Sequence, residues 1–222
     1  MEKTSIQVEL ASYLGKLLRD HFGKGPSSVY VSVNKPFITM HIRDFIAPME
    51  RVLIDQGKLL KVEELRDHLM EELLPEIKAT VQTMLGVNIS EMYYDWSLEN
   101  RSGMILSVLS ESDHQLKDYP QKEAIQQETA VISEMAEKVP AHMDSCFLNN
   151  RTLLIRRDGI LVRIEKELIV NGFEEALRLS KKGLEKRLLK HSKINSILDG
   201  EVTDLFVDWD FEKDKSYIIF VL

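Results

Sequence analysis

The sequence predicts an α+β fold built from two tandem α-β-β-α-β-β modules, each an antiparallel four-stranded sheet covered by helices. Two observations predict it: an internal repeat, and the order of helical and alternating apolar segments within each copy. The repeat is clearest at the chain's two tryptophans, where Tyr94–Glu99 matches Val207–Glu212 at an offset of 113. Because the match continues without a gap to Leu109 and Leu222, we attribute it to duplication.

The domain boundaries follow from this repeat. We expect a first module at residues 1–110 and a second, divergent module at residues 118–222, joined by a polar stretch before Tyr119-Pro120. A weaker match upstream pairs Ile38–Ile42 with Ile160–Ile164 at an offset of 122. The difference between the two offsets predicts that the second copy is nine residues shorter.

Each element of the first module has its own signal. Apolar residues at helical spacing from Ile6 to Leu17 predict the first helix. The segment Gly23-Lys24-Gly25-Pro26 ends that helix, because glycine accepts left-handed backbone angles and proline cannot extend the hydrogen-bond ladder. Pro75 lies inside the long second helix and predicts a kink or two abutting helices. The expected strands are 28–33, 38–42, 92–96 and 104–108, and the expected long helix is 62–81.

The second module repeats this order with different turns. Asp158-Gly159 predicts a two-residue hairpin between strands at Thr152–Arg157 and Ile160–Glu165. Asn171 is a candidate cap for a helix that begins near Phe173. The strands alternate between apolar and polar residues, which favours antiparallel sheets over a doubly wound parallel sheet.

Composition excludes several classes of protein. The 222 residues carry 36 acidic and 29 basic side chains, for a net charge of −7, and this acidic balance argues against nucleic-acid binding. One cysteine, Cys146, is too few for a disulfide framework. No apolar run approaches the length of a membrane span, and the start of the sequence has no signal-peptide core. We therefore expect a cytoplasmic protein without a direct membrane span.

The loop Gly23-Lys24-Gly25-Pro26 is the candidate ligand-binding site. Its glycines would let backbone N–H groups approach an anion, and Lys24 supplies positive charge. The order of helix before and strand after is the reverse of a nucleotide P-loop, so a simple helix stop is the favoured interpretation. The corresponding segment of the second copy, near Val139-Pro140-Ala141, lacks both glycines.

A row of carboxylates shares one strand face in each copy. Such a row can bind a divalent cation or hold an acid with a raised pKa, although a solvated outer face is the favoured interpretation. The pairs Asp95-Trp96 and Asp208-Trp209 are expected to be structural signatures of the repeat, with each indole toward the apolar face. The carboxylates of the row are Glu91 and Asp95 in the first copy and Asp204, Asp208 and Asp210 in the second.

Other chemical candidates are weaker. His142 and Cys146 are four positions apart and could share a metal in a helix, but no third ligand is evident. A locally basic helix could dock an acidic partner, with a solvated helix face as the favoured alternative. The basic residues are Lys181, Lys182, Lys186, Arg187, Lys190 and Lys193. We predict no catalytic residues, no metal and no cofactor.

Taken in order, these features resemble the MpsC-type family, named after a sodium-translocating, membrane-potential-generating system of bacteria. The resemblance rests on Gly23–Pro26 before an alternating strand, the hairpin around Phe37–Ile42, the helix bearing Leu73–Glu76, and Gly86-Val87 before the Asp95 strand. The second copy matches weakly. The resemblance implies a small soluble bacterial protein that accompanies a membrane system for cation or inorganic-carbon uptake.

Two functions remain open at this point. The leading hypothesis is a non-enzymatic accessory protein that binds membrane transport subunits, is held at the membrane through that partner, and forms a homodimer. The alternative is a sensor of a small anion or nucleotide, with a pocket between the two copies. An enzyme ranks third, because it would need the carboxylate row to line a pocket.

Overall fold

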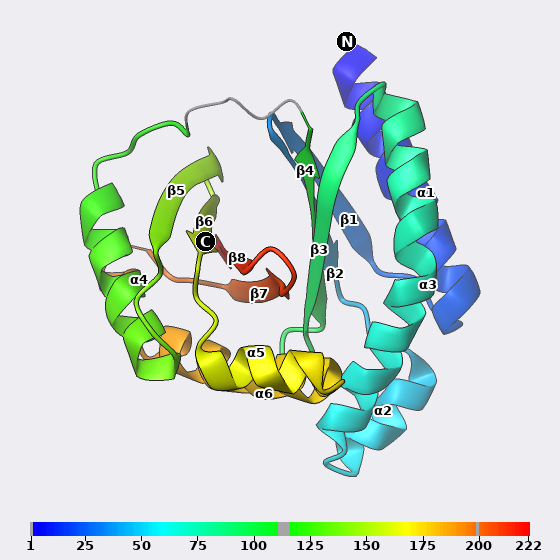
Figure 1. The fold of residues 1–222 in the computed structure, drawn as a ribbon. Helices are drawn as coiled ribbons and strands as arrows, with labels where there is room; N and C mark the ends of the chain where they lie inside the picture. The colour runs from blue at the N-terminus through cyan, green and yellow to red at the C-terminus, as the bar shows by residue number, and fades with distance from the viewer. Residues whose placement is uncertain (1, 111–115, 199) are drawn as a thin grey trace. The chain divides into compact units, whose positions relative to one another are not determined.

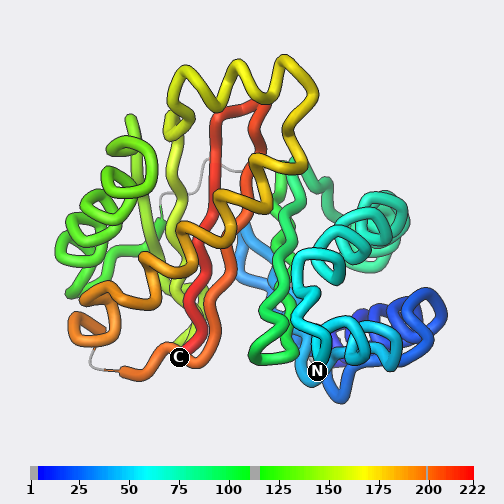
Figure 2. The backbone as a smooth tube through the Cα atoms, turned by 90° about the horizontal axis from the view of Figure 1, so that it is seen from below, coloured from blue at the N-terminus to red at the C-terminus, as the bar shows by residue number. Residues whose placement is uncertain are grey.

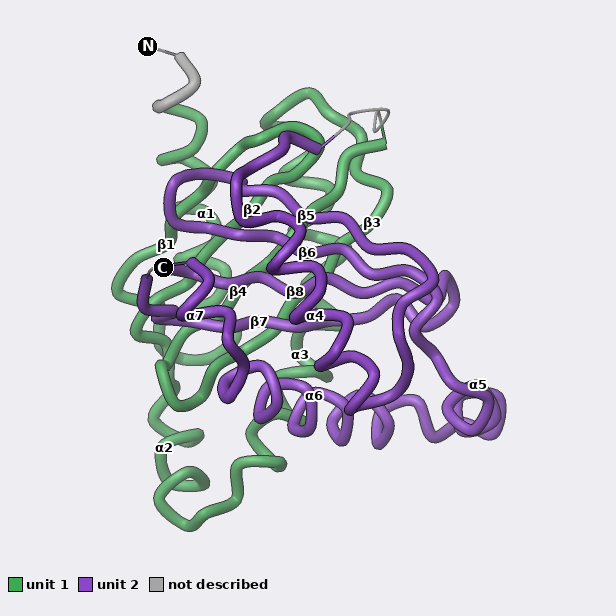
Figure 3. Tube along the Cα trace, turned by 90° about the vertical axis from the view of Figure 1, so that its left-hand side faces the viewer, with its two compact units in different colours: residues 1–114 green, residues 115–222 purple. Residues whose placement is uncertain are grey.

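The computed structural model describes residues 2–110, 116–198 and 200–222, and the chain divides into two compact units, residues 1–114 and 115–222 (Figure 3). Each unit holds one four-stranded antiparallel sheet and its own helices (Figure 1). The predicted α+β fold with two tandem modules is therefore confirmed.

The first unit has the strand order β1-β2-β4-β3, so two antiparallel hairpins meet in the middle of the sheet. The side chains of α1 and α3 pack on one face of this sheet, around Leu14, Met70, Ile77 and Ile105. The elements are α1 (Glu2–Phe22), β1 (Ser28–Asn34), β2 (Phe37–Arg43), α2 (Pro48–Asp55), α3 (Leu59–Leu85), β3 (Ile89–Ser97) and β4 (Ser102–Leu109).

The second unit repeats this topology with the strand order β5-β6-β8-β7. Helix α6 crosses the strands of its sheet diagonally (Figure 2). Leu177 and Leu189 of this helix belong to the same core cluster as Ile155, Val207 and Phe220 of the sheet. The elements are α4 (Lys122–Ala136), β5 (His142–Asn149), β6 (Thr152–Asp158), α5 (Arg163–Val170), α6 (Glu174–Lys190), α7 (Ile194–Ile197), β7 (Asp204–Asp210) and β8 (Lys215–Val221).

The predicted hairpin at Asp158-Gly159 is wrong. Strand β6 ends at Asp158, and the segment expected to pair with it leads into α5 instead. The N–H groups of Ile160 and Leu161 both donate to Asp214 Oδ1 at 2.8 Å, so they are not available to a strand partner. The glycine turn therefore directs the chain into a helix, and the hairpin turn lies at 149–152.

The two copies align at a different offset in this region. Strand β6 corresponds to β2 at an offset of 115, and α5 corresponds to α2 at the same offset. Between these strands and the tryptophans the second unit is therefore two residues shorter, not nine.

Helix α3 continues through Pro75 as one helix, so the alternative of two abutting helices is wrong, and the alternative of a kink stays a prediction. A proline removes only one hydrogen bond of the ladder, and the packed face of this long helix holds both halves in place. The buried face includes Arg66, whereas the neighbouring apolar residue Leu65 is exposed.

Both faces of the sheets carry apolar side chains. All eight residues of β4 are buried, and six of the seven residues of β8 are buried as well. In the register, Trp96 lies opposite Gly103 on one face while Asp95 lies opposite Met104 on the other. The antiparallel topology is confirmed, but the central strands do not alternate between apolar and polar residues.

Candidate functional site

A buried ion pair joins α2 to α3 in the first unit. Both side chains are almost completely inaccessible to solvent, and Arg66 Nε donates to Glu50 Oε1 at 2.7 Å. A second nitrogen of the guanidinium donates to Glu50 Oε2 at 2.8 Å and to the backbone oxygen of Phe45 at 2.9 Å. Glu50 also accepts the N–H of Ala47 at 2.7 Å, so one carboxylate caps α2 and neutralises the cation of α3.

Three aromatic rings surround the guanidinium of Arg66. Its central carbon lies 4.5 Å from the ring centroid of Trp96, 5.0 Å from that of Phe45 and 5.9 Å from that of Phe22. The rings of Phe22 and Phe45 also contact each other edge to face at 5.0 Å. A planar, weakly hydrated cation stacks well on aromatic faces, which explains why arginine occupies this apolar position.

The second unit has the same pair at the offset of 115. Lys181 Nζ donates to Glu165 Oε1 at 2.8 Å, and Glu165 Oε2 accepts the N–H of Val162 at 2.8 Å. The ammonium lies 5.6 Å from the ring centroid of Trp209. Each unit therefore places one carboxylate, one cation and one indole in the same arrangement.

The surroundings of the second pair are more polar than those of the first. Arg157 is fully buried on β6, and its guanidinium donates to Ser216 at 2.9 Å, to Ser133 at 3.0 Å and to Glu185 Oε2 at 2.6 Å. These contacts satisfy three of its nitrogen atoms and hold β6, β8, α4 and α6 together.

A further carboxylate completes this cluster. The side chain of Glu137, directly after α4, is only 4% exposed, and its Oε2 lies 2.5 Å from Lys181 Nζ. We call Glu137, Arg157, Glu165, Lys181 and Glu185 the buried charge cluster. At the offset of 115, its three additional members Glu137, Arg157 and Glu185 stand where the first unit has Phe22, Ile42 and Met70.

The cluster shifts the pKa values of two of its acids in opposite directions. Burial, followed by the neighbouring Glu185 carboxyl, raises the pKa of Glu137 to about 8. Burial also opposes ionisation of Glu185, but the Arg157 guanidinium and a hydrogen bond from Glu137 hold the pKa of Glu185 below its ordinary value. The two neighbouring acids therefore differ in the direction of their pKa shifts.

The loop Gly23-Lys24-Gly25-Pro26 lies between α1 and β1. Gly23 has a φ of +73°, and a Cβ on Gly25 would lie 3.1 Å from the backbone oxygen of Gly15, so both glycines serve the end of α1. The charge of Lys24 acts on Asp44, whose pKa is lowered first by its hydrogen bond to Ser27. Ligand binding at this loop stays a prediction.

The carboxylate row does not form a solvated outer face, which corrects the favoured interpretation. Asp95 is 2% exposed and Asp208 is 7% exposed, and Asp204 is buried as well. In the sheet register, Asp95 lies opposite Met104 and Asp208 lies opposite Tyr217. Arg178 of α6 forms an ion pair with Asp208, which partly neutralises this face.

The two signature tryptophans occupy equivalent core positions. Trp96 belongs to the helix-side core of the first unit and Trp209 to that of the second. The backbone N–H of each tryptophan donates to the side chain of the preceding aspartate, at 2.7 Å for Asp95 and 2.8 Å for Asp208. The aspartates thus fix the strand conformation at each tryptophan.

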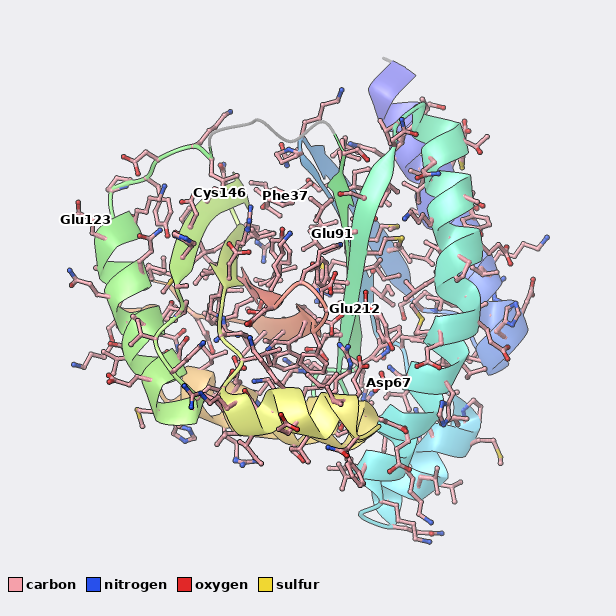
Figure 4. The ribbon with its side chains drawn as sticks, viewed as in Figure 1. Phe37, Asp67, Glu91, Glu123, Cys146 and Glu212 are labelled. Atoms are coloured by element: carbon pink, nitrogen blue, oxygen red, sulfur yellow. The ribbon has the colours of Figure 1, made fainter. Side chains whose placement is uncertain are left out.

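His142 and Cys146 lie on strand β5, not on a helix (Figure 4 labels Cys146). His142 is exposed and Cys146 is buried, and burial raises the pKa of the Cys146 thiol to about 11, so the thiolate that binds metals is disfavoured. Among residues 2–110, 116–198 and 200–222, no group of three or more His, Cys, Asp or Glu side chains is placed to hold a metal ion.

The basic helix is only partly a solvated face. Lys181 and Lys182 are buried, and Lys181 belongs to the buried charge cluster. Arg187 and Lys190 are exposed on the other side of α6. Sequence reasoning treats all these cations alike, because charge alone does not separate a paired, buried lysine from a solvated one.

Sequence reasoning also misses the ion pairs themselves, although a signal for them is present. The sequence separation between Glu50 and Arg66 is the same as that between Glu165 and Lys181. The incorrect offset of 122 hides this equivalence, whereas an alignment with an offset of 115 places the two glutamates together and the two cations together.

These features define a tandem α+β repeat protein with one buried ion pair under one tryptophan in each copy. Two segments, residues 2–111 and 121–222, match the family described as Na+-translocating membrane potential-generating system (MpsC). The chain belongs to the MpsC family and carries two tandem copies of its domain. No curated protein and no solved structure matches the chain. Within the described residues, no helix has the length and apolar character needed to cross a bilayer.

Proposed function

We propose that the protein is a non-enzymatic accessory protein of a bacterial membrane system for uptake of cations or inorganic carbon, and that it binds a membrane subunit of that system. Membership of both units in the MpsC family is the observation that carries this proposal, since the family description names a Na+-translocating membrane system. Because the described helices include no membrane span, the role we assign is binding to such a subunit and not translocation.

An exposed apolar surface supports the proposed binding. Met49 is 77% exposed on α2, and Val52, Leu59 and Leu60 are exposed close to it in sequence. We call these four residues the α2–α3 corner. Apolar side chains gathered on a surface are typical of protein contacts. The second unit exposes Ile164 at the place equivalent to Met49, so part of the feature is repeated.

The charge around the α2–α3 corner indicates the chemistry of the partner. Within residues 49–61, Arg51, Lys58 and Lys61 are exposed beside one exposed acid, Asp55, so the corner is positive, whereas the whole chain has a net charge of −7. Complementary charge steers association and fixes orientation. The proposed partner surface is therefore a segment of the membrane subunit that carries apolar and acidic side chains.

Cross-linking in living cells followed by purification of the tagged full chain tests the proposal. We expect recovery of an integral membrane subunit with the unchanged chain, and at least tenfold less with Met49→Asp combined with Val52→Asp. Val8→Asp is the matched control, because Val8 is also an exposed valine on a helix but lies outside the corner. Failure to recover any membrane protein would contradict the accessory role, and equal recovery by all variants would contradict the role of the corner.

A further inference from the structure

The buried charge cluster of the second unit brings two acidic side chains together without enough hydrogen-bond donors. Oε1 of Glu137 and Oε1 of Glu185 are buried and accept no hydrogen bond from the described residues, whereas Oε2 of Glu137 contacts the Lys181 ammonium at 2.5 Å. We propose that Glu137 and Glu185 form a proton-binding site, in which one proton is shared between the two carboxyl groups. This proposal does not depend on the role of the protein at the membrane.

The positions of the neighbouring cations show why a proton is needed. Lys181 lies between two carboxylates, 2.5 Å from Glu137 Oε2 and 2.8 Å from Glu165 Oε1. Arg157 directs its nitrogen atoms to Glu185 Oε2 and to two serines. Neither cation donates to Glu185 Oε1, so a proton on Glu137 is the donor that completes the cluster.

The charge count leads to the same result. Charged groups enter the cluster from four elements: Glu137 follows α4, Arg157 is on β6, Glu165 is on α5, and Lys181 and Glu185 are on α6. Three carboxylates face two cations, which leaves one negative charge when all five are ionised. Since an unpaired buried charge is costly, one bound proton makes the cluster neutral and stable.

The first unit serves as an internal comparison. Its residues at the positions of Glu137, Arg157 and Glu185 do not titrate, and its single carboxylate is matched by the single guanidinium of Arg66. Proton binding is therefore a property of the second unit. A pKa of about 8 for Glu137, raised by burial and by the neighbouring carboxyl, agrees with this assignment.

Nuclear magnetic resonance of the full chain, labelled with carbon-13 at the glutamate side-chain carboxyls, measures the titration directly. We expect one glutamate carboxyl to titrate with a midpoint near 8, and this transition to be absent in Glu137→Gln. Glu134→Gln is the matched control in the last turn of α4, because Glu134 is exposed, and it should leave the transition unchanged. Circular dichroism verifies that each variant folds. If Glu137→Gln does not fold, Glu137→Phe, which introduces the residue that the first unit has at this position, is used in its place.

Two results would overturn the proposal. One is a titration in which every glutamate carboxyl of the unchanged protein has its midpoint below about pH 6, within the ordinary range of the group. The other is a transition near pH 8 that persists in a folded protein without the Glu137 carboxyl. Replacing sodium with an organic cation in the buffer should leave the midpoint unchanged, whereas a midpoint that falls as sodium is added would assign the site to a metal cation instead.

Discussion

Glu137 holds, in the second unit, the position that Phe22 holds in the first. Each lies at the end of the first helix of its unit and against the cation of the repeated ion pair: the Phe22 ring centroid is 5.9 Å from the Arg66 guanidinium, and Glu137 Oε2 is 2.5 Å from the Lys181 ammonium. An aromatic face suits a guanidinium, whereas an ammonium is a compact charge that favours carboxylates. The change from arginine to lysine and the change from phenylalanine to glutamate are therefore consistent with each other.

The stability of the second unit should fall as pH rises through neutrality. Folded Glu137, with a pKa of about 8, keeps a proton that the unfolded chain loses near its ordinary pKa of 4.5. The folded state binds more protons between these values, so the free energy of unfolding should decrease with pH by up to about 1.4 kcal/mol per pH unit and level off above pH 8. Urea unfolding followed by Trp209 fluorescence in a Trp96→Phe background reports the second unit.

Glu137→Gln provides the comparison for this pH profile. The amide does not titrate, so the variant should show little change between about pH 5 and pH 8, whereas exposed Glu134→Gln should keep the slope. Glu185 has the opposite effect on the pH profile. Because folding lowers its pKa, the stability that it contributes is lost only as pH falls below the ordinary pKa range of a glutamate. A second unit that becomes more stable as pH rises from about 6 to 8 would contradict the protonated state of Glu137.

Breaking the ion pair of the first unit should be strongly destabilising. Arg66→Met leaves the Glu50 carboxylate buried without its cation, at an expected cost of about 3–5 kcal/mol. Lys61→Met on the same helix removes an exposed charge and should change stability by less than about 0.5 kcal/mol. Urea unfolding followed by Trp96 fluorescence in a Trp209→Phe background measures both.

Adding Glu50→Gln to Arg66→Met tests the reason for that cost. The amide oxygen can still accept the N–H of Ala47 but carries no charge, so the double variant should regain part of the lost stability. If the double variant is less stable than Arg66→Met alone, the cost does not arise from an uncompensated charge.

Local pattern is sufficient to predict the repeat, the two hairpins around the tryptophans and the antiparallel sheets. It fails at Asp158-Gly159, where turn propensity is the same whether a strand or a helix follows. The carboxylate of Asp214, which is distant in sequence, decides the outcome because it accepts hydrogen bonds from the N–H groups of Ile160 and Leu161. No local rule contains that information.

The buried charges are the second failure, and for a different reason. Charge alone predicts a solvated position for Lys181 and for Asp95, because charged residues are rarely buried without a partner. The partner of Lys181 is Glu165 on the preceding helix. Their separation in sequence is not one that brings two residues together within a single helix or strand. Asp95 is buried as well, opposite Met104 in the sheet register. Burial of a charge is thus a tertiary property, and only the comparison of two copies could indicate it from sequence.

Gly103 should be intolerant of any side chain, because the indole of Trp96 lies across it. A Cβ at this position would clash with two ring carbons of Trp96, and the rigid ring is held between Phe45 and Arg66. Gly103→Ala should therefore cost about 1–3 kcal/mol through overpacking. Gly15→Ala is the matched control: it lies inside α1 with nothing within 4 Å of its Cβ, so alanine should stabilise the protein by about 0.5–1 kcal/mol. Thermal unfolding of both variants gives the comparison. If Gly103→Ala were as stable as the unchanged chain, the indole could not occupy the place that the β3–β4 register assigns to it.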